Sequence, residues 1–261
     1  MDPHSVDSAR HYPIQKGDDY VRSRCYESAQ KIYTPAVHPR EPFATSRGMR
    51  VSPFYEREVA LGGYFMEVAG WERAHGYAAN EPTLLSKYRD QVPTREAEWD
   101  NRHFWEVSNA EQLALSDGVG MINLSHFAIF DVEGADAESL MEYLSVAKVG
   151  TDTAIGKGVY THFLDQAGGI RSDLTIIRLA TDCFRVVCGG DTGHRDYIWM
   201  RNMSDKRGFA NVTFHDRSEQ LATLGLWGPD HDNHTSYEPS DPKQCPCDVT
   251  EEGLQFQSDG W

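Results

Sequence analysis

Between residues 158 and 188 the apolar positions alternate or run together in short groups that turn-forming residues separate. This pattern predicts two or three short strands, with turns at 165–169 and 180–183. The strands are marked by Val159, Phe163, Ile170, Leu174, Ile176, Ile177, Phe184, Val186 and Val187. The paired Gly168 and Gly169 allow positive φ angles and a tight reversal. One carboxylate, Asp173, falls on the second strand, where a rigid backbone could hold it toward a ligand. The alternative is an exposed carboxylate on an edge strand that bonds a turn.

The same patterns predict further elements on both sides of these strands. Residues 52–71 mix apolar and aromatic positions and predict a strand or short helix. Ser108 and Glu111 have the spacing of a capping box, which predicts a helix from there through Leu115. The remaining expectations are a charged helix at 95–105, strands within 120–133, helices at 135–144 and 195–203, and a final pair of strands at 211–215 and 222–227. Antiparallel strands in a mixed sheet with helices on one side define an α+β fold.

The two ends of the chain differ from its middle. Residues 1–45 are polar and rich in Pro and His, which predicts an extended lead-in. A short helix is expected to start at Asp18 or Asp19 and to carry Tyr20, Cys25 and Ile32 inward. Residues 230–261 hold few apolar positions and no period, which is typical of a disordered tail. The expected division is therefore 1–45, 46–229 and 230–261.

Charge excludes two classes of partner. The 261 residues carry 40 acidic and 25 basic side chains, a formal net charge of −15. Such an excess repels nucleic acid and anionic membranes. No apolar run reaches the length of a membrane span, and the N-terminus does not have the pattern of a signal peptide, so a cytoplasmic protein is expected. Scarce Lys beside Arg favours a halophilic source with a high-salt cytoplasm, with ordinary solubility as the alternative.

The five cysteines form no regular framework. In a cytoplasmic protein they are expected to be free thiols. Cys245 and Cys247 are too close together to be half of a normal zinc knuckle, although His231 and His234 lie near them. The sequence therefore predicts no metal site.

Four ordered blocks within about residues 46–229 carry a family resemblance. Gly168-Gly-Ile-Arg-Ser-Asp-Leu174 resembles a Gly-Gly-x-x-x-Asp-Leu signature, and Gly120-Met-Ile-Asn-Leu-Ser-His-Phe127 resembles a strand motif with Asn123 in place of the usual Asp. Leu221–Pro229 and the upstream block of 50–65 with Gly70-Trp-Glu-Arg73 complete the set. Together they resemble the glycine cleavage T-protein (aminomethyltransferase) family. The upstream block is similar to the branch in which this domain follows an FAD-dependent dimethylglycine or sarcosine dehydrogenase.

The resemblance implies the first subdomain of the T-protein fold, with the family's C-terminal barrel absent and the chain truncated. No Gly-x-Gly-x-x-Gly occurs in the sequence, so the usual FAD fingerprint is missing. A separate FAD oxidase or a lipoyl carrier protein is therefore the expected partner, beside folate and a small amine-derived one-carbon donor.

The resemblance also implies site residues for tetrahydrofolate and transfer of a one-carbon unit to its N5. Asp173 would orient the folate and handle the proton there. Tyr160, Val187 and Phe127 would line the pocket for the pterin and benzoyl groups, or serve as ordinary core. Gly189 stands where stand-alone T-proteins have Asn, so that contact is lost or supplied by backbone. His126 is expected to be a core histidine, and Arg185 stands where an aromatic residue is common, with no role assigned.

Three functions stay open at this point. The first is a tetrahydrofolate-dependent aminomethyl or one-carbon transferase that uses an aminomethyl or imine donor. The second is a folate-dependent O- or S-demethylase. The third is a non-catalytic remnant or folate-binding accessory subunit, because the family's pterin-binding glutamate and a later arginine cannot be assigned in this chain.

Overall fold

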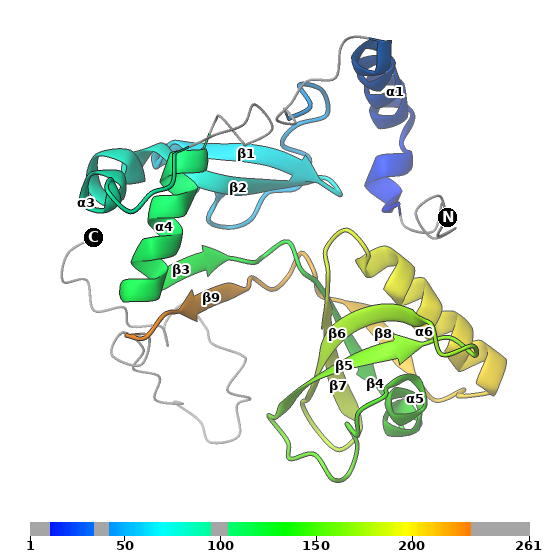
Figure 1. The fold of residues 1–261 in the computed structure, drawn as a ribbon. Coiled ribbons are helices and arrows are strands. Elements are labelled where there is room, and N and C mark those ends of the chain that lie inside the picture. Colours follow the sequence, from blue (N-terminus) through cyan, green and yellow to red (C-terminus); the bar gives the residue numbers. More distant parts are fainter. Residues whose placement is uncertain (1–10, 34–41, 95–103, 231–261) are drawn as a thin grey trace. The chain divides into compact units, whose positions relative to one another are not determined.

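Two units make up the chain in the computed structural model, which describes residues 11–33, 42–94 and 104–230 (Figure 1). Residues 125–223 belong to one unit, and residues 12–124 with 224–232 form the other. The predicted tail after Asp230, the cysteine pair at 245 and 247, and residues 95–103 of the predicted charged helix lie outside the described residues.

The first unit is built on a five-stranded antiparallel sheet in the order β5-β6-β7-β4-β8 (Figure 1). The strands are β4 (Ala128–Glu133), β5 (Gly158–Leu164), β6 (Ile170–Arg178), β7 (Cys183–Cys188) and β8 (Thr213–Asp216). The structure thus has three strands between 158 and 188, where the sequence predicted two or three. Gly168, in the turn between β5 and β6, has a φ of 82°, which a residue with a side chain adopts only with strain.

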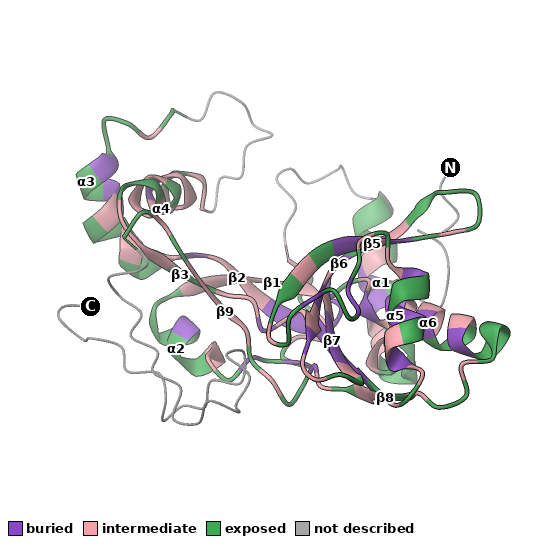
Figure 2. Cartoon of the chain, turned by 90° about the horizontal axis from the view of Figure 1, so that it is seen from below, coloured by how far each residue is buried: buried purple, intermediate pink, exposed green. Residues whose placement is uncertain are grey.

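One face of this sheet forms the core of the unit. Alternate residues of β6 and β7, among them Leu174, Ile176, Phe184 and Val186, are buried on it. Helix α5 (Ala137–Leu144) adds Leu140, Met141 and Leu144 to the same cluster, and α6 (Gly193–Arg207) adds Met200. Figure 2 shows buried residues on β7, α5 and α6. Because both helices pack on one face, the opposite face of the sheet is the one on which a site can form.

The second unit contains two separate strand pairs and several helices. Strands β1 (Gly63–Val68) and β2 (Trp71–Tyr77) form one antiparallel hairpin, and β3 (Gly120–Asn123) pairs with β9 (Leu224–Trp227). Its α-helices are α1 (Asp18–Tyr33), α2 (Tyr55–Ala60), α3 (Ser86–Tyr88) and α4 (Trp105–Asp117). Short 3-10 turns span Pro13–Lys16 and Ala78–Asn80, and a π-type turn spans Glu81–Leu85. None of the helices in the described ranges is both long and apolar enough to traverse a lipid bilayer.

One expectation about these elements was wrong, and the partners of the last two strands were not predicted. Helix α4 begins at Trp105, so Ser108 lies inside it and caps nothing: its hydroxyl donates to the carbonyl of His75, and Glu111 accepts from the Tyr77 amide. The two last strands do not pair with each other, because β8 joins β4 and β9 joins β3 in the other unit. Both outcomes depend on contacts between residues that are distant in sequence.

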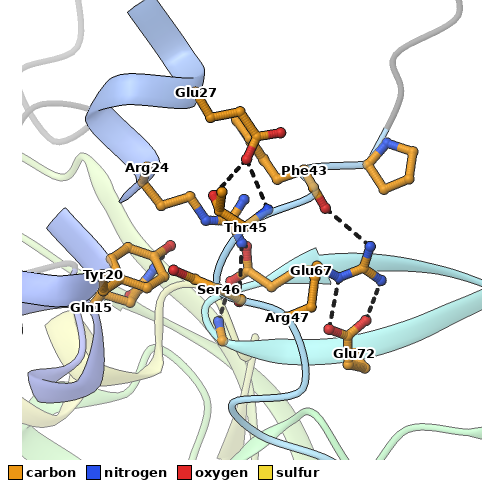
Figure 3. Close-up of polar contacts among 12 residues, drawn as sticks. Gln15, Tyr20, Arg24, Glu27, Phe43, Thr45, Ser46, Arg47, Glu67 and Glu72 are labelled. Atoms are coloured by element: carbon orange, nitrogen blue, oxygen red, sulfur yellow. Dashed lines mark hydrogen bonds and ion pairs between the residues drawn. The ribbon is translucent and has the colours of Figure 1, made fainter. Parts of the chain in front are cut away.

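Polar side chains attach α1 to the β1–β2 hairpin and to the loop before it (Figure 3). Arg24 forms an ion pair of 2.8 Å with Glu67 of β1. Glu27 accepts hydrogen bonds from the backbone amides of Ala44 at 2.7 Å and Thr45 at 2.9 Å. The helix was predicted, but its orientation was not, because Cys25 and Ile32 are exposed and Tyr20 is half-buried.

The acid sensitivity of this attachment provides a first prediction. Burial alone would raise the pKa of Glu27, but hydrogen bonds from Thr45 and Ala44, together with Lys31, lower it from 4.5 to about 2. Because the folded pKa is lower than the unfolded one, the ionised carboxylate stabilises the fold above pH 4.5, and this contribution is lost as the pH falls toward 2. Glu27→Gln is expected to weaken the attachment by about 2 kcal/mol at neutral pH.

Peptide-resolved hydrogen exchange of residues 42–47 measures this effect, and the ratio of variant to native rates at each pH cancels the intrinsic pH dependence. The ratio should be large at pH 7 and fall toward one as the pH drops from 4.5 toward 2. A ratio that does not depend on pH would show that the charge of Glu27 does not hold the loop.

Candidate functional site

The face of the five-stranded sheet opposite α5 and α6 carries a continuous row of side chains across four strands. Tyr160 lies opposite Thr175, Thr175 opposite Val187, and Val187 opposite Ile129. Side chains at directly opposed positions share one face of an antiparallel sheet and touch across it. Because Ile176 and Val186 point into the core, their neighbours in this row point away from it.

A second row runs beside the first and contains Asp173. His162 lies opposite Asp173, and Leu174 pairs with Cys188, which in turn pairs with Ala128. Gly189 directly follows Cys188 and Phe127 directly precedes Ala128, so both lie just beyond the paired residues of β7 and β4. The register thus brings Asp173, Tyr160 and Val187 together on one sheet face, and Gly189 and Phe127 adjoin the ends of its strands.

Asp173 is exposed on β6, which lies between β5 and β7 in the sheet. The alternative of an edge-strand carboxylate is therefore wrong. The hydroxyl of Tyr160 donates a hydrogen bond of 3.3 Å to its carboxylate, and 63% of Tyr160 is exposed. Partial loss of water and the nearby Asp173 charge raise the pKa of Tyr160, so the phenol stays protonated and donates at neutral pH. The pair presents an accessible carboxylate that accepts a hydrogen bond from a neighbouring phenol.

A buried carboxylate on the core side holds the strand of Asp173 in place. Ser172 donates to Asp196 of α6 at 2.8 Å, and Thr192 donates to the same oxygen at 3.1 Å. Asp196 is 1% exposed and also forms an ion pair with Arg195. Burial raises the pKa of Asp196, and the hydrogen bonds from Ser172 and Thr192 and the charge of Arg195 oppose the rise. Sequence reasoning missed this contact, because nothing in the spacing of residues 172 and 196 marks it.

Arg185, for which the sequence indicated no role, lies at the other end of the open face. It lies opposite Asp131 in the register, and its guanidinium donates to that carboxylate at 2.8 Å and 3.2 Å. Arg217 adds a third hydrogen bond to Asp131 at 3.1 Å. Both Arg185 and Asp131 are buried. This part of the face is therefore structural, and the accessible part lies over β5, β6 and the Val187 end of β7.

Gly190 is required by close packing, whereas Gly189 is not. A Cβ on Gly190 would lie 1.9 Å from the carbonyl oxygen of His126, which is backbone and cannot move aside. On Gly189 the nearest atom would be a side-chain oxygen of Asp191 at 3.2 Å. We expect Gly190→Ala to lower the free energy of unfolding by about 3 kcal/mol and Gly189→Ala to change it little.

Urea unfolding of the two glycine variants side by side tests this expectation. Equal midpoints would contradict the packing around His126. If Gly189→Ala is stable, it also reports whether a methyl group at that position blocks a ligand on the open face.

Two other residues that the sequence analysis singled out, His126 and Asn123, make contacts in the structure. The rings of His126 and Phe127 meet edge to face at 5.3 Å, and Asn123 belongs to the other unit, where its amide donates to Ser52 at 2.8 Å. Within the described ranges no three His, Cys, Asp or Glu side chains gather as a metal site would need. The group of His231, His234, Cys245 and Cys247 lies outside those ranges.

Comparison with known families divides the chain at about residue 53. Residues 54–234 match the family described as "GCVT N-terminal domain". Residues 1–52 match the one described as "FAD dependent oxidoreductase central domain". The open face with Asp173 thus lies wholly within the first match.

Individual proteins match most of the chain. A 4-methylaminobutanoate oxidase (formaldehyde-forming) of Paenarthrobacter nicotinovorans is 32% identical over 230 residues, covering 88% of this chain and 26% of that protein. Mouse mitochondrial sarcosine dehydrogenase is 28% identical over 257 residues, covering 87% and 28%. The chain thus spans about a quarter of the length of these relatives. The solved aminomethyltransferase T of the glycine cleavage system from Bartonella henselae shares the fold, with a TM-score of 0.51 at 22% identity over 71% of this chain and 42% of that one.

Proposed function

Because the chain belongs to the family of the GCVT N-terminal domain, we propose that its open sheet face binds tetrahydrofolate for transfer of a one-carbon unit. The observation that supports this most is the carboxylate of Asp173, which is exposed on a central strand and held by the hydroxyl of Tyr160. Asp173 is the proposed catalytic residue, and Phe127, Tyr160, Val187 and Gly189 are the proposed folate contacts.

The residues of this face suit a flat, nitrogen-rich ligand. Asp173 can accept hydrogen bonds from ring N–H groups, while Tyr160 offers a flat ring and Val187 an apolar contact on the neighbouring strands. When bound, tetrahydrofolate supplies the nitrogen to which the one-carbon unit is attached. Asp173 would accept a hydrogen bond close to that nitrogen. It would also take up the proton that is released when the one-carbon unit is attached. A positioned carboxylate in such a role accelerates a reaction by about 10²- to 10⁴-fold.

The names of two relatives support a donor at the oxidation level of formaldehyde. One is called a formaldehyde-forming 4-methylaminobutanoate oxidase and the other a sarcosine dehydrogenase. An aminomethyl group or an imine carries a carbon at that level, so its transfer to a folate nitrogen needs no further oxidant. We therefore propose an aminomethyl or imine donor, supplied by an FAD-dependent oxidase or a lipoyl carrier protein.

A tetrahydrofolate titration of the purified chain tests the proposal, with heat of binding as the readout. Asp173→Asn is compared with Asp182→Asn, which makes the same change at an exposed position in the turn between β6 and β7. The titration is run at low and at high KCl, because salt screens the self-repulsion that a net charge of −15 causes and so stabilises the compact chain. Saturable binding that Asp173→Asn weakens and Asp182→Asn does not would support the site.

Absence of binding by a chain that circular dichroism shows to be folded would contradict the proposal. Binding without transfer would favour the accessory role, in which the chain holds folate and another polypeptide completes the reaction. The transfer assay described in the Discussion separates these two outcomes.

A further inference from the structure

Helix α1 has its polar side buried and its apolar side exposed. Arg24 and Glu27 are both 7% exposed, and they face the hairpin and the loop before it (Figure 3). Val21, Tyr26 and Ile32 are 44%, 68% and 75% exposed. An amphipathic helix on the surface of a single domain normally has the opposite arrangement. The exposed side of α1 therefore has the composition of a contact surface.

The exposed apolar residues form one line along the helix. Val21, Cys25, Ala29 and Ile32 are spaced by four, four and three residues, which places them on a single face. All four are exposed, and we call them the α1 stripe. The adjacent Tyr26 widens this surface with an aromatic ring.

The attachment of α1 prevents the stripe from turning inward. Rotation of the helix would break the ion pair between Arg24 and Glu67, whose side chains are 9% and 5% exposed. It would also remove Glu27 from the amides of Ala44 and Thr45. Breaking a buried ion pair by separating its partners costs more than burying two aliphatic side chains gains. The stripe can therefore be covered only by something outside the described unit.

The family division of the chain indicates what covers it. Residues 1–52, which include α1 and the loop that holds it, match the central domain of FAD-dependent oxidoreductases, while the rest of the unit lies in the other match. A segment of about 50 residues cannot form the core of such a domain by itself. The apolar side of α1 is thus the side on which the remainder of an oxidoreductase central domain would pack.

We propose that the α1 stripe is the docking surface for an FAD-dependent oxidoreductase domain. The inference rests on the proposed function in one respect, which is that docking would bring the source of the one-carbon donor to the chain. The docking itself depends on α1, and it involves neither Asp173 nor folate.

Cys25 reports docking directly, because it is exposed and lies in the middle of the stripe. Its alkylation by N-ethylmaleimide is followed by mass spectrometry of its own peptide, in the free chain and in a chimera. The chimera is the Paenarthrobacter oxidase in which this chain replaces the quarter that it matches. Alkylation of Cys25 should be slower by about tenfold or more in the FAD-loaded chimera, because a covered thiol reacts only when the contact opens.

Two double variants show whether the α1 stripe causes the protection of Cys25. Val21→Gln with Ile32→Gln should restore the rate of the free chain and lower the FAD content of the chimera. Val59→Gln with Leu61→Gln changes two apolar residues of similar exposure, 46% and 49%, outside the stripe and should do neither. Asp173→Asn should leave Cys25 protected, so a failure of folate binding and a failure of docking give different results.

Three results would overturn the inference. The first is a chimera that retains FAD while Cys25 reacts as fast as in the free chain. The second is a chimera that binds no FAD, because a packed stripe should complete the central domain. The third is protection of Cys25 that rises with the concentration of the free chain alone, which would assign the stripe to a second copy of this chain.

Discussion

Replacing Asp173 by asparagine is expected to slow tetrahydrofolate-dependent one-carbon transfer by about 10²- to 10⁴-fold. The amide keeps the size of the side chain and can still accept a hydrogen bond from Tyr160, but it cannot take up a proton. Because the position is exposed on the sheet face, the substitution should leave the stability of the fold unchanged.

The assay follows release of the amine from an aminomethyl donor in a single turnover with excess chain. Asp182→Asn serves as the matched control and should transfer at the native rate. A rate of Asp173→Asn equal to that of Asp182→Asn would remove the carboxylate from the chemistry. A methyl ether or thioether donor in the same assay tests the demethylase alternative.

The second large effect is expected on stability, at the buried end of the open face. Asp131→Asn leaves the guanidinium of Arg185 buried without its anion, because Asp131 is the carboxylate to which Arg185 and Arg217 both donate. Removing one partner of a buried ion pair lowers the free energy of unfolding by about 3–5 kcal/mol. That is a large share of the stability of a single domain.

An exposed ion pair provides the comparison. Asp152 lies 3.4 Å from Lys148, with side chains that are 75% and 78% exposed. Asp152→Asn should cost less than about 1 kcal/mol, since water screens the pair. Urea unfolding, with β4 and β7 followed by peptide-resolved hydrogen exchange, measures both variants. Equal effects would mean that the Asp131 cluster is not the buried structural contact described here.

The strands of the first unit could be predicted from sequence because their burial follows the alternation of their residues. Ile176 and Val186 face the core, and their neighbours Ile177 and Val187 face away from it, as the period of two requires. The turn at Gly168 was also predictable, because its positive φ favours glycine. In this part of the chain, local preference and tertiary structure agree.

Elements whose environment comes from distant residues could not be predicted. The apolar pattern of α1 predicts that Ile32 points inward, yet the ion pair from Arg24 to Glu67 turns the helix the other way. Ser108 and Glu111 have capping spacing, but their partners are β2 residues more than thirty positions earlier. Long-range contacts of this kind override local propensity.

The same distinction applies to the candidate site. Asp173 and Tyr160 were selected through a motif, and the register places them on one face. The residues that fix this face were not selected, because Ser172 meets Asp196 and Arg185 meets Asp131 only after the sheet has formed. Pairs separated by 24 and 54 positions leave no periodic signal in a single sequence.

Methyl NMR during a tetrahydrofolate titration tests the central claim most directly, because adjacent residues on opposite faces of the sheet act as internal controls. If the open face is the folate site, the methyl signals of Val187 and Ile177, which are half-buried on that face, will shift with a common saturation curve. The signals of Val186, Ile176 and Val132, which are buried in the core, will move little. Shifts confined to the core residues or to the other unit, with Val187 and Ile177 unchanged at saturation, would contradict the assignment of folate to the Asp173 face.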